Sequence, residues 1–319
     1  MQKGTKLPAR WEDFLQAFSD KIAEASTDLP STRCISRHNL SSIIAGIKQE
    51  LELLTTFPSG VEVLSHLCAM GLASQVPVTD NDGGIPSKDF YLVGMSASHD
   101  LAVSPYEMLQ AYNNDGVICY FSALSYYDLT TQLPTHHHIA SIVKADTTNI
   151  TSERERPLVQ PITNIKKKKS IGTLAFSYDG ANYYSTKRRS NTIPGTKRRI
   201  YNKRTILRIT TIEQTLLDTL QYPAHCGGPE VVFEAWGNHI GKIDEGLLLN
   251  YLQSIDTNTL NRRVGALFEL LDYKPELRLL TFLCRSKSES STVSEPYDIT
   301  LLRGINYTNL NPDWKVLTP

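Results

Sequence analysis

Residues 166–189 read KKKKSIGTLAFSYDGANYYSTKRR and contain two strand-like segments between two runs of positive charge. The dipeptide Asp179-Gly180 separates the segments, and such a dipeptide between strand-like runs is typical of a two-residue β-hairpin turn. Pairing centred on that turn places Phe176 opposite Tyr183. It also brings both basic runs to the open end of the same hairpin, so we expect seven positive charges to lie together there.

The excess positive charge of the chain is confined to the segment around this hairpin. The 319 residues include 33 Lys and Arg against 33 Asp and Glu, yet residues 154–208 carry 15 basic against 2 acidic residues. The segments on either side are acidic, with 9 basic against 17 acidic residues in 1–153 and 9 against 14 in 209–319. Because neighbouring like charges repel, this concentration favours a polyanionic partner, above all a phosphate backbone. The alternative is a solvated loop in which salt screens the charges.

We predict that basic side chains of this segment contact the phosphates of double-stranded DNA. They are Lys166, Lys167, Lys168, Lys169, Lys187, Arg188, Arg189, Lys197, Arg198, Arg199, Lys203 and Arg204. Three tyrosines, Tyr183, Tyr184 and Tyr201, lie among these charges. They either stack on exposed bases or pack within the sheet.

The first 95 residues have the order of elements expected of a winged helix-turn-helix domain. Apolar residues recur at helical spacing in 10–24, in 36–54 and in 59–71, where Ser59 is a candidate N-cap. Two strand-like segments around the loop 80–87 follow. In such a domain the third helix enters the major groove, and we predict DNA contacts from four residues: Arg37, His38, Ser65 and His66.

The charge of this N-terminal part also allows a protein-interaction module. Residues 1–95 carry 8 basic against 11 acidic residues, and Asp80 and Asp82 lie at the predicted wing tip. Acidic side chains there would meet phosphates unfavourably. Both interpretations remain open at this stage.

The remainder of the chain, 96–319, is predicted to be a larger mixed α/β domain, so that the fold class is α+β. A helix at 104–113, a buried strand at 116–121 and a strand at 137–144 are followed, after the hairpin, by a strand at 205–210. Four helical patterns then occupy 211–221, 229–240, 244–255 and 259–271, and 277–285 reads as a strand.

No motif for catalysis or for metal or cofactor binding stands out. His136, His137 and His138 are consecutive, so on a strand only the first and third share a face, with no carboxylate nearby to complete a metal site. Asp272 and Lys274 resemble the end of some nuclease sites, but the sequence lacks the glycine-rich, serine-elbow and zinc-helix motifs of common enzymes. We therefore expect no enzyme, no metal and no cofactor. The alternatives are a nuclease or nucleotidyltransferase, or an RNA-binding protein without operator specificity.

Cysteine usage and hydropathy indicate a cytoplasmic protein. The five cysteines are scattered without paired spacing, which is typical of reduced, mostly buried thiols. No apolar segment approaches the roughly eighteen residues that span a bilayer. We expect no contact with a membrane.

Three stretches resemble the AbiEi family of antitoxins: ICYFSALSYYDLTTQLP at 118–134, RTILRITTIEQTLLDTLQYPAHCGGPEVVFEAW at 204–236 and NRRVGALFELLDY at 261–273. The resemblance implies an antitoxin of a type IV toxin–antitoxin system. Members of that family repress their own operon through an N-terminal winged helix and counteract a nucleotidyltransferase-like toxin. The resemblance leaves open whether the antitoxin binds the toxin directly.

The residues shared with that family have mainly structural explanations. Thr210 or Thr211 is placed to cap the helix that begins near 212, and Gly227 with Gly228 permits a turn that side chains would block. Asp218 is expected to bind a backbone group or one of the arginines Arg262 and Arg263.

Overall fold

The structure of the protein is a computed structural model that describes residues 10–23, 33–54, 57–79, 89–94, 103–144, 171–202, 205–292, 299–302 and 305–319. Six of the predicted phosphate-binding residues, Lys166–Lys169, Lys203 and Arg204, lie outside these ranges, as does the predicted wing tip with Asp80 and Asp82.

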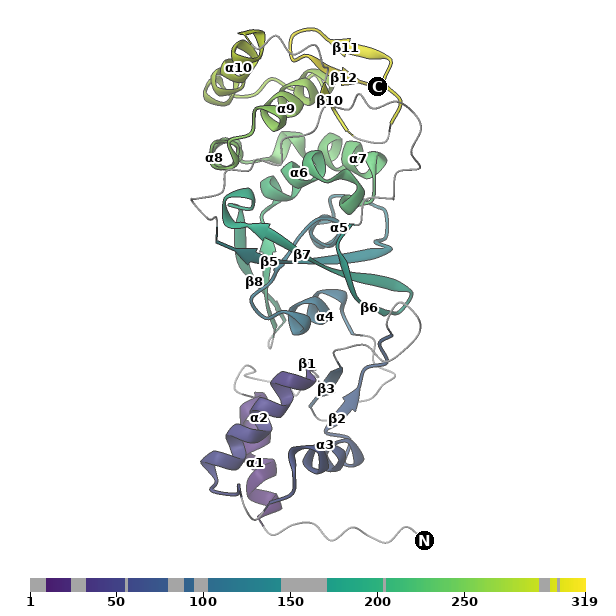
Figure 1. Cartoon of the computed structure of the whole chain (residues 1–319), viewed down its shortest axis with the longest axis vertical. Helices are drawn as coiled ribbons and strands as arrows, with labels where there is room; N and C mark the ends of the chain where they lie inside the picture. The colour runs from purple at the N-terminus through teal and green to yellow at the C-terminus, as the bar shows by residue number, and fades with distance from the viewer. Residues whose placement is uncertain are drawn as a thin grey trace. The chain divides into compact units, whose positions relative to one another are not determined.

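The chain is mixed α and β, as predicted (Figure 1). The described helices are α1 (Trp11–Ala23), α2 (Arg37–Glu50), α3 (Gly60–Ala69), α4 (Pro105–Tyr112), α5 (Phe121–Tyr126), α6 (Ile212–Gln221), α7 (Pro229–His239), α8 (Glu245–Ile255), α9 (Asn258–Leu270) and α10 (Leu277–Thr292). The described strands are β1 (Arg33–Ser36), β2 (Ala73–Gln75), β3 (Phe90–Val93), β4 (Val117–Ile118), β5 (His136–Val143), β6 (Thr173–Tyr178), β7 (Ala181–Arg189), β8 (Thr196–Asn202), β9 (Thr205–Thr210), β10 (Ile299–Thr300), β11 (Asn309–Asn311) and β12 (Val316–Thr318).

The chain is divided into two compact units. The first comprises Met1–Asp115, Leu174–Gly180 and Arg198–Leu207. The second comprises Gly116–Thr173, Ala181–Lys197 and Arg208–Pro319.

Helices α1, α2 and α3 of the first unit pack with a three-stranded antiparallel sheet in the order β1-β3-β2. Trp11, Phe14 and Phe18 present one apolar face of α1 to this core. Ser59 begins α3 with a reciprocal capping box to Glu62, which confirms the predicted start of that helix. Strand β1 was not predicted, because its four residues offer no alternating pattern.

The first unit extends beyond the predicted boundary near residue 95. The Phe176 ring of β6 lies 4.9 Å from Phe90 of β3 and 5.8 Å from Tyr112 of α4. The Cys34 Sγ of β1 lies 3.4 Å from the Met108 Sδ of α4. These contacts place α4 and β6 in the same compact unit as the N-terminal strands.

A six-stranded sheet has the order β6-β7-β5-β4-β9-β8. The turn between β6 and β7 has Asp179 at φ 48° and Gly180 at φ 73°, the two left-handed residues that the predicted hairpin turn requires. Strands β5 and β7 run parallel, with His138 opposite Tyr184 and Val143 opposite Arg189. This parallel pairing was not predicted, since it joins strands that are distant in the sequence and no turn signal marks it.

Helices α5 and α6 of the second unit pack beside strands β4, β5 and β7, and α7, α8 and α9 extend the apolar core (Figure 1). Trp236 of α7 is fully buried, and its indole Nε1 donates to the Leu216 carbonyl at 3.2 Å and to Thr219 Oγ1 at 3.0 Å. The four helices predicted between 211 and 271 are therefore confirmed as α6 to α9.

Trp314 is central to the packing of strands β10, β11 and β12 against α9. The Trp314 ring covers Gly265, where any side chain would overlap it, and the indole Nε1 donates to Glu269 Oε1 at 2.6 Å. The Arg262 Nε donates to the Trp314 carbonyl at 2.6 Å. Trp314 is thus held on α9 by its indole, which bonds Glu269, and by its carbonyl, which bonds Arg262.

The prediction of a strand at 277–285 is wrong, because this segment forms the first part of α10. Leu279 and Leu283 are buried and four residues apart, whereas the intervening Leu280 is exposed. That spacing matches one face of a helix rather than the alternation of a strand. Among the described residues, no helix combines the length and apolar character needed to cross a membrane.

Candidate functional site

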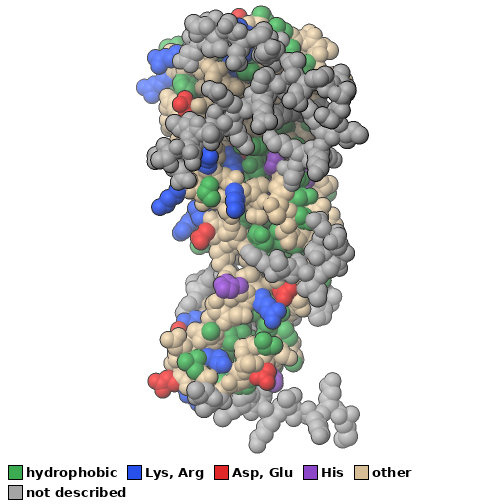
Figure 2. Space-filling model, viewed as in Figure 1, with side chains coloured by type: hydrophobic (Ala, Val, Ile, Leu, Met, Phe, Trp, Pro, Cys, Tyr) green, Lys and Arg blue, Asp and Glu red, His purple; other side chains and the backbone are tan. Residues whose placement is uncertain are grey.

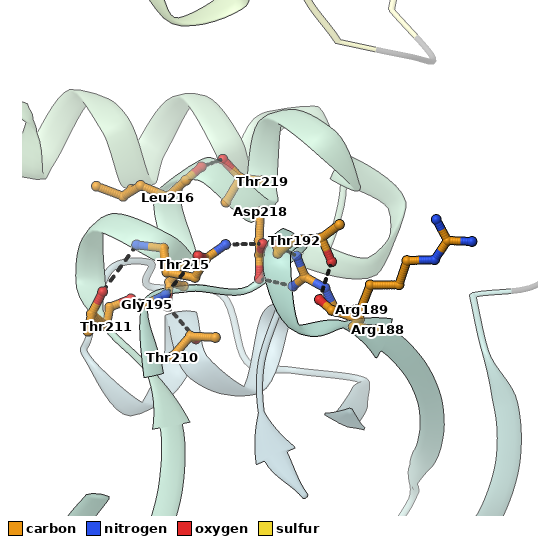
Figure 3. Close-up of polar contacts among 11 residues, drawn as sticks. Arg188, Arg189, Thr192, Gly195, Thr210, Thr211, Thr215, Leu216, Asp218 and Thr219 are labelled. Carbon is orange, nitrogen blue, oxygen red and sulfur yellow. Dashed lines mark hydrogen bonds and ion pairs between the residues drawn. The ribbon is translucent and has the colours of Figure 1, made fainter. Parts of the chain in front are cut away.

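Arg188 lies at the centre of the most buried ionic contact that the structure describes. Its guanidinium Nη1 donates to Asp218 Oδ2 at 2.6 Å, and Nη2 donates to the Thr192 carbonyl. Both charged side chains are almost completely buried, at 2% and 0% exposure. Figure 3 shows Arg188 turned toward Asp218 and its neighbour Arg189 turned away.

The Arg188–Asp218 pair continues into a hydrogen-bonded network that joins β7 to α6. Gln214 Nε2 donates to the second carboxylate oxygen at 2.8 Å, and the Gln214 side-chain oxygen accepts from the Gly195 backbone N–H at 3.2 Å. Thr211 caps α6 by accepting from the Gln214 N–H at 3.3 Å, which settles the predicted choice between Thr210 and Thr211.

Burial and pairing act in opposite directions on the two charged groups. Burial by itself would lower the pKa of the Arg188 guanidinium, but the adjacent Asp218 carboxylate more than offsets this and the pKa is raised. For Asp218, burial raises the pKa of the carboxyl despite the opposing effects of Arg188 and Gln214. A charge in this position is stabilised by its partner, so removing either partner alone leaves an uncompensated buried group.

The prediction that Arg188 contacts phosphate is wrong. Successive side chains of a strand point to opposite faces, so Arg188 faces the helices whereas Lys187 and Arg189 face solvent. Three consecutive basic residues on a strand cannot form one surface, because the middle side chain points to the opposite face from its two neighbours. Asp218 also has a different arginine from the two that we predicted.

Arg262 and Arg263 bind backbone carbonyl groups instead. Arg262 donates to the Trp314 carbonyl, and Arg263 donates to Thr300 O at 2.9 Å and to Leu220 O at 3.2 Å. Their role is structural, because both buried guanidinium groups donate to main-chain carbonyls of other segments.

A cluster of histidine and tyrosine rings lies beside this pair. His136 and His138 share a face of β5, as predicted, with ring centroids 5.1 Å apart, and His225 lies 5.5 Å from His138. Tyr184 stacks on His138, and the Tyr120 ring lies 5.4 Å from the Arg188 guanidinium carbon. Tyr184 therefore packs within the sheet, as does Tyr183, which is buried against His137.

Burial lowers the pKa of the three consecutive histidines, His136, His137 and His138, and so favours their neutral form. The ring cluster forms no metal centre within the described part of the chain. No group of three or more His, Cys, Asp or Glu side chains is placed there to bind a metal ion. Burial lowers the pKa of His137 to about 4, and burial followed by the three neighbouring imidazoles lowers the pKa of His138 well below 6.5. Neither ring nitrogen of His138 has a hydrogen-bond partner among the described residues.

We expect the free energy of unfolding to fall as the pH is lowered from about 7 to about 5. Below pH 6.5 His138 is protonated in the unfolded chain but stays unprotonated in the folded protein. The folded state therefore loses stability as the pH falls toward the lower, folded-state pKa of this histidine. Each such histidine contributes about 1.4 kcal/mol per pH unit in this window. Urea unfolding at several pH values measures the slope, and His138→Phe is expected to reduce it. An unchanged slope in that variant would contradict the neutral, buried imidazole.

The exposed basic residues of β7 meet the end of β5. Because Val143 pairs with Arg189, Lys144 follows at the same end of the parallel pair. Lys144, Lys187 and Arg189 are all exposed, and we call these three residues the β5–β7 basic cluster. Figure 2 shows several of the described Lys and Arg side chains on one face of the molecule, with uncharged surface between them.

The other described basic residues of the middle segment lie on or beside β8. Lys197 has its Nζ 5.0 Å from the centre of the Tyr127 ring, a cation–π contact. Arg198 and Arg199 are exposed on β8, and Tyr201 of the same strand is 38% exposed.

The four residues predicted on the N-terminal helices have different surroundings. Arg37 pairs with Asp89 at 3.1 Å, and His38 next to it is exposed at the start of α2. Ser65 is exposed on α3, whereas His66 is half-buried in an edge-on contact with Trp11, with ring centroids 5.4 Å apart.

Two further sequence expectations concern turns. Gly227 and Gly228 both have positive φ, at 91° and 105°, so the predicted glycine-dependent turn is confirmed. Asp272 also has positive φ, at 51°, in the turn that ends α9. Asp272 is therefore assigned a structural role at the C-terminal end of this helix.

Comparison with known proteins gives a fold. No family model matches the sequence, and no curated protein is similar to it. Among solved structures, the RV2827C protein from Mycobacterium tuberculosis matches 98% of this chain and 92% of its own, with a TM-score of 0.51 and 12% sequence identity. The two chains share a fold. At 12% identity the match extends to architecture alone, over nearly the whole of this chain.

Proposed function

We propose that the chain is a DNA-binding antitoxin that binds operator DNA, represses its own operon in the cytoplasm and counteracts a nucleotidyltransferase-like toxin without being an enzyme itself. Two independent features support this proposal. One is the arrangement of the first compact unit, and the other is the resemblance of three stretches of the second to the AbiEi family.

The order of elements in the first unit carries the proposal. Its first six elements are α1, β1, α2, α3, β2 and β3, with the sheet order β1-β3-β2 and antiparallel pairing throughout. A winged helix-turn-helix has this arrangement, with its third helix in the major groove and the connection between its last two strands as the wing. In that assignment α3 is the helix that reads DNA, and Ser65 lies on its exposed side.

The phosphate contacts are assigned mainly to the β5–β7 basic cluster. Helix α3 contains no lysine or arginine, and Glu62 is its one acidic residue. Base recognition by this helix therefore needs an electrostatic contribution from elsewhere, since phosphate contacts supply most of the non-specific affinity for DNA. Lys144, Lys187 and Arg189 are exposed and free of described acidic partners.

The antitoxin part of the proposal rests on the resemblance. Its three stretches correspond to β4–α5, to β9–α6–α7 and to α9, which contribute to one apolar core. Several polar residues in these stretches have structural roles: Thr211 caps a helix, Asp218 pairs with Arg188, and Arg263 binds carbonyl groups. Because these roles are structural, the proposed action on the toxin is assigned to other residues.

The test is a competition between the DNA upstream of the chain's own gene and a scrambled duplex of equal length. We expect the upstream duplex to bind at least about 10³-fold more tightly, as specific sites generally do. Ser65→Glu places a negative charge on the exposed side of α3 and is expected to remove this preference. The matched control is Ser254→Glu on the exposed side of α8. Equal affinity of the wild-type protein for both duplexes would contradict operator recognition.

A further inference from the structure

Helix α3 presents a stripe of small and apolar side chains on its exposed side. Val61, Ser65 and Cys68 are spaced by four and three residues, so they lie on one face of the helix, and Ala69 adjoins Ser65. All four residues are exposed, and we call them the α3 stripe. The opposite face supplies the buried residues of the helix to the core of the first unit.

Helix stability does not explain the valine in the α3 stripe. A β-branched side chain has a lower helix propensity than alanine. Val61 is 66% exposed, so burial in the core of its own unit contributes little in return. A contact with a partner would remove this apolar surface from water and gain free energy. The valine therefore suits a contact face better than a solvated one.

The polar side chains of α3 restrict what the helix can recognise. Its sequence, GVEVLSHLCA, contains no arginine, lysine, asparagine or glutamine, the residues that form paired hydrogen bonds with guanine or adenine. Glu62 Oε2 accepts from the Ser59 N–H at 2.8 Å and from Ser59 Oγ at 2.9 Å, so this carboxylate is turned back to the start of the helix. His66 is half-buried against Trp11. The α3 stripe therefore offers apolar contact and one hydroxyl.

The major groove of DNA offers an apolar group at one base. Thymine carries a 5-methyl group there, whereas the other features that distinguish the base pairs are hydrogen-bond donors and acceptors. An apolar side chain in the groove gains free energy by covering that methyl group. Ser65 and Ala69 are small, so they leave room for the helix to approach the base edges. The composition of the α3 stripe thus favours base pairs that contain thymine.

We propose that α3 recognises thymine methyl groups of the operator, and that Val61 is the side chain that covers a methyl group. This inference rests on the proposed function, since it takes α3 to be the helix in the major groove. It adds the base that is read and the chemical group that is recognised. A protein partner on the same face would be indifferent to a methyl group of DNA, so the test separates the two occupants.

The experiment uses the full chain and two duplexes of the upstream sequence. In the second duplex, deoxyuridine replaces every thymidine within the region that the protein protects from cleavage. The replacement removes the methyl group and keeps the hydrogen-bonding groups of the base. We expect the wild-type protein to bind the deoxyuridine duplex about fourfold more weakly for each methyl contact, which is the usual gain from burying one such group. Fluorescence anisotropy measures both affinities.

Two variants assign the preference to α3. Val61→Ala shortens an exposed side chain, so the fold is expected to persist and the preference for thymidine to fall below about twofold. The matched control is Leu247→Ala, at an exposed leucine of α8, which is expected to keep the wild-type preference. Circular dichroism of both variants checks that the helices are retained.

The outcomes separate this inference from the proposed function. Equal binding of the thymidine and deoxyuridine duplexes by the wild-type protein would overturn the inference while operator recognition stands. A preference for thymidine that Val61→Ala retains would overturn it as well, because the methyl groups would then be read by other residues. If the wild-type protein does not distinguish the upstream duplex from the scrambled one, the proposed function fails and the inference fails with it.

Discussion

Replacing Arg188 by methionine lowers the free energy of unfolding by about 3–5 kcal/mol, because it leaves the Asp218 carboxylate buried without its charged partner. The Thr192 carbonyl also loses the hydrogen bond that it accepts from Arg188. Urea unfolding followed by circular dichroism gives the change, provided that the transition stays two-state. The effect is large because the pair is almost fully buried, unlike the exposed pairs Arg10–Asp13 and Lys21–Glu50.

The neighbouring residue supplies the matched control. Arg189 is exposed, so Arg189→Met is expected to change stability by no more than about 0.5 kcal/mol. The double variant R188M/D218L removes both charges and is expected to recover much of the loss, since apolar replacement of a whole buried pair is often tolerated. If Arg188→Met and Arg189→Met lower the free energy of unfolding by similar amounts, the two side chains do not point to opposite faces of β7.

Replacing Trp314 by alanine is expected to destabilise the protein by about 3–5 kcal/mol, the usual range for a buried tryptophan. The indole is 3% exposed, covers Gly265 of α9 and donates to Glu269. Its loss leaves a cavity where β12 meets α9 and removes one of the hydrogen bonds to the Glu269 carboxylate, which keeps the bond from Asn311 Nδ2 at 2.7 Å. Chemical unfolding again provides the measurement.

Leu310 of β11 provides the comparison, because it is 47% exposed and Leu310→Ala is expected to cost no more than about 0.5 kcal/mol. Gly265→Ala tests the same contact from the opposite side. Its new methyl group overlaps the indole, so overpacking is expected to cost about 1–3 kcal/mol. If Gly265→Ala is as stable as the wild type, the indole does not lie over α9.

Local signals predicted the elements that are regular and long. The turn at Asp179-Gly180 was predictable because two left-handed residues have few compatible side chains. The helices α6 to α9 follow from apolar spacing, and Ser59 and Thr211 mark helix starts that the structure confirms. These are features in which neighbouring residues decide the conformation.

Features that depend on distant residues were not predictable in the same way. Nothing near Asp218 in the sequence indicates that its partner is Arg188, thirty residues earlier, rather than the arginines that follow it. The parallel pairing of β5 with β7 likewise joins strands without a local turn. Residues 277–285 were mistaken for a strand because a short apolar run satisfies either period, and the burial of Leu279 with Leu283 decides for a helix.

The sequence predicted some of the residues of the candidate DNA surface, but it did not predict how they are arranged. Counting charges located Lys187 and Arg189, but it could not separate them from Arg188, whose positive charge serves the core. Lys144 was missed because it is alone in the sequence and joins the other two only through the pairing of β5 with β7.

The salt dependence of DNA binding by K187Q/R189Q tests most directly whether β7 presents a phosphate-binding face. Removing two phosphate contacts is expected to weaken binding and to make the slope of log K against log salt less steep by about 1.8. The control variant K242Q/K274Q removes the same charge at exposed positions outside the β5–β7 basic cluster, and we expect it to keep the wild-type slope. Equal slopes in the wild type and both variants would contradict a phosphate-binding role for this strand.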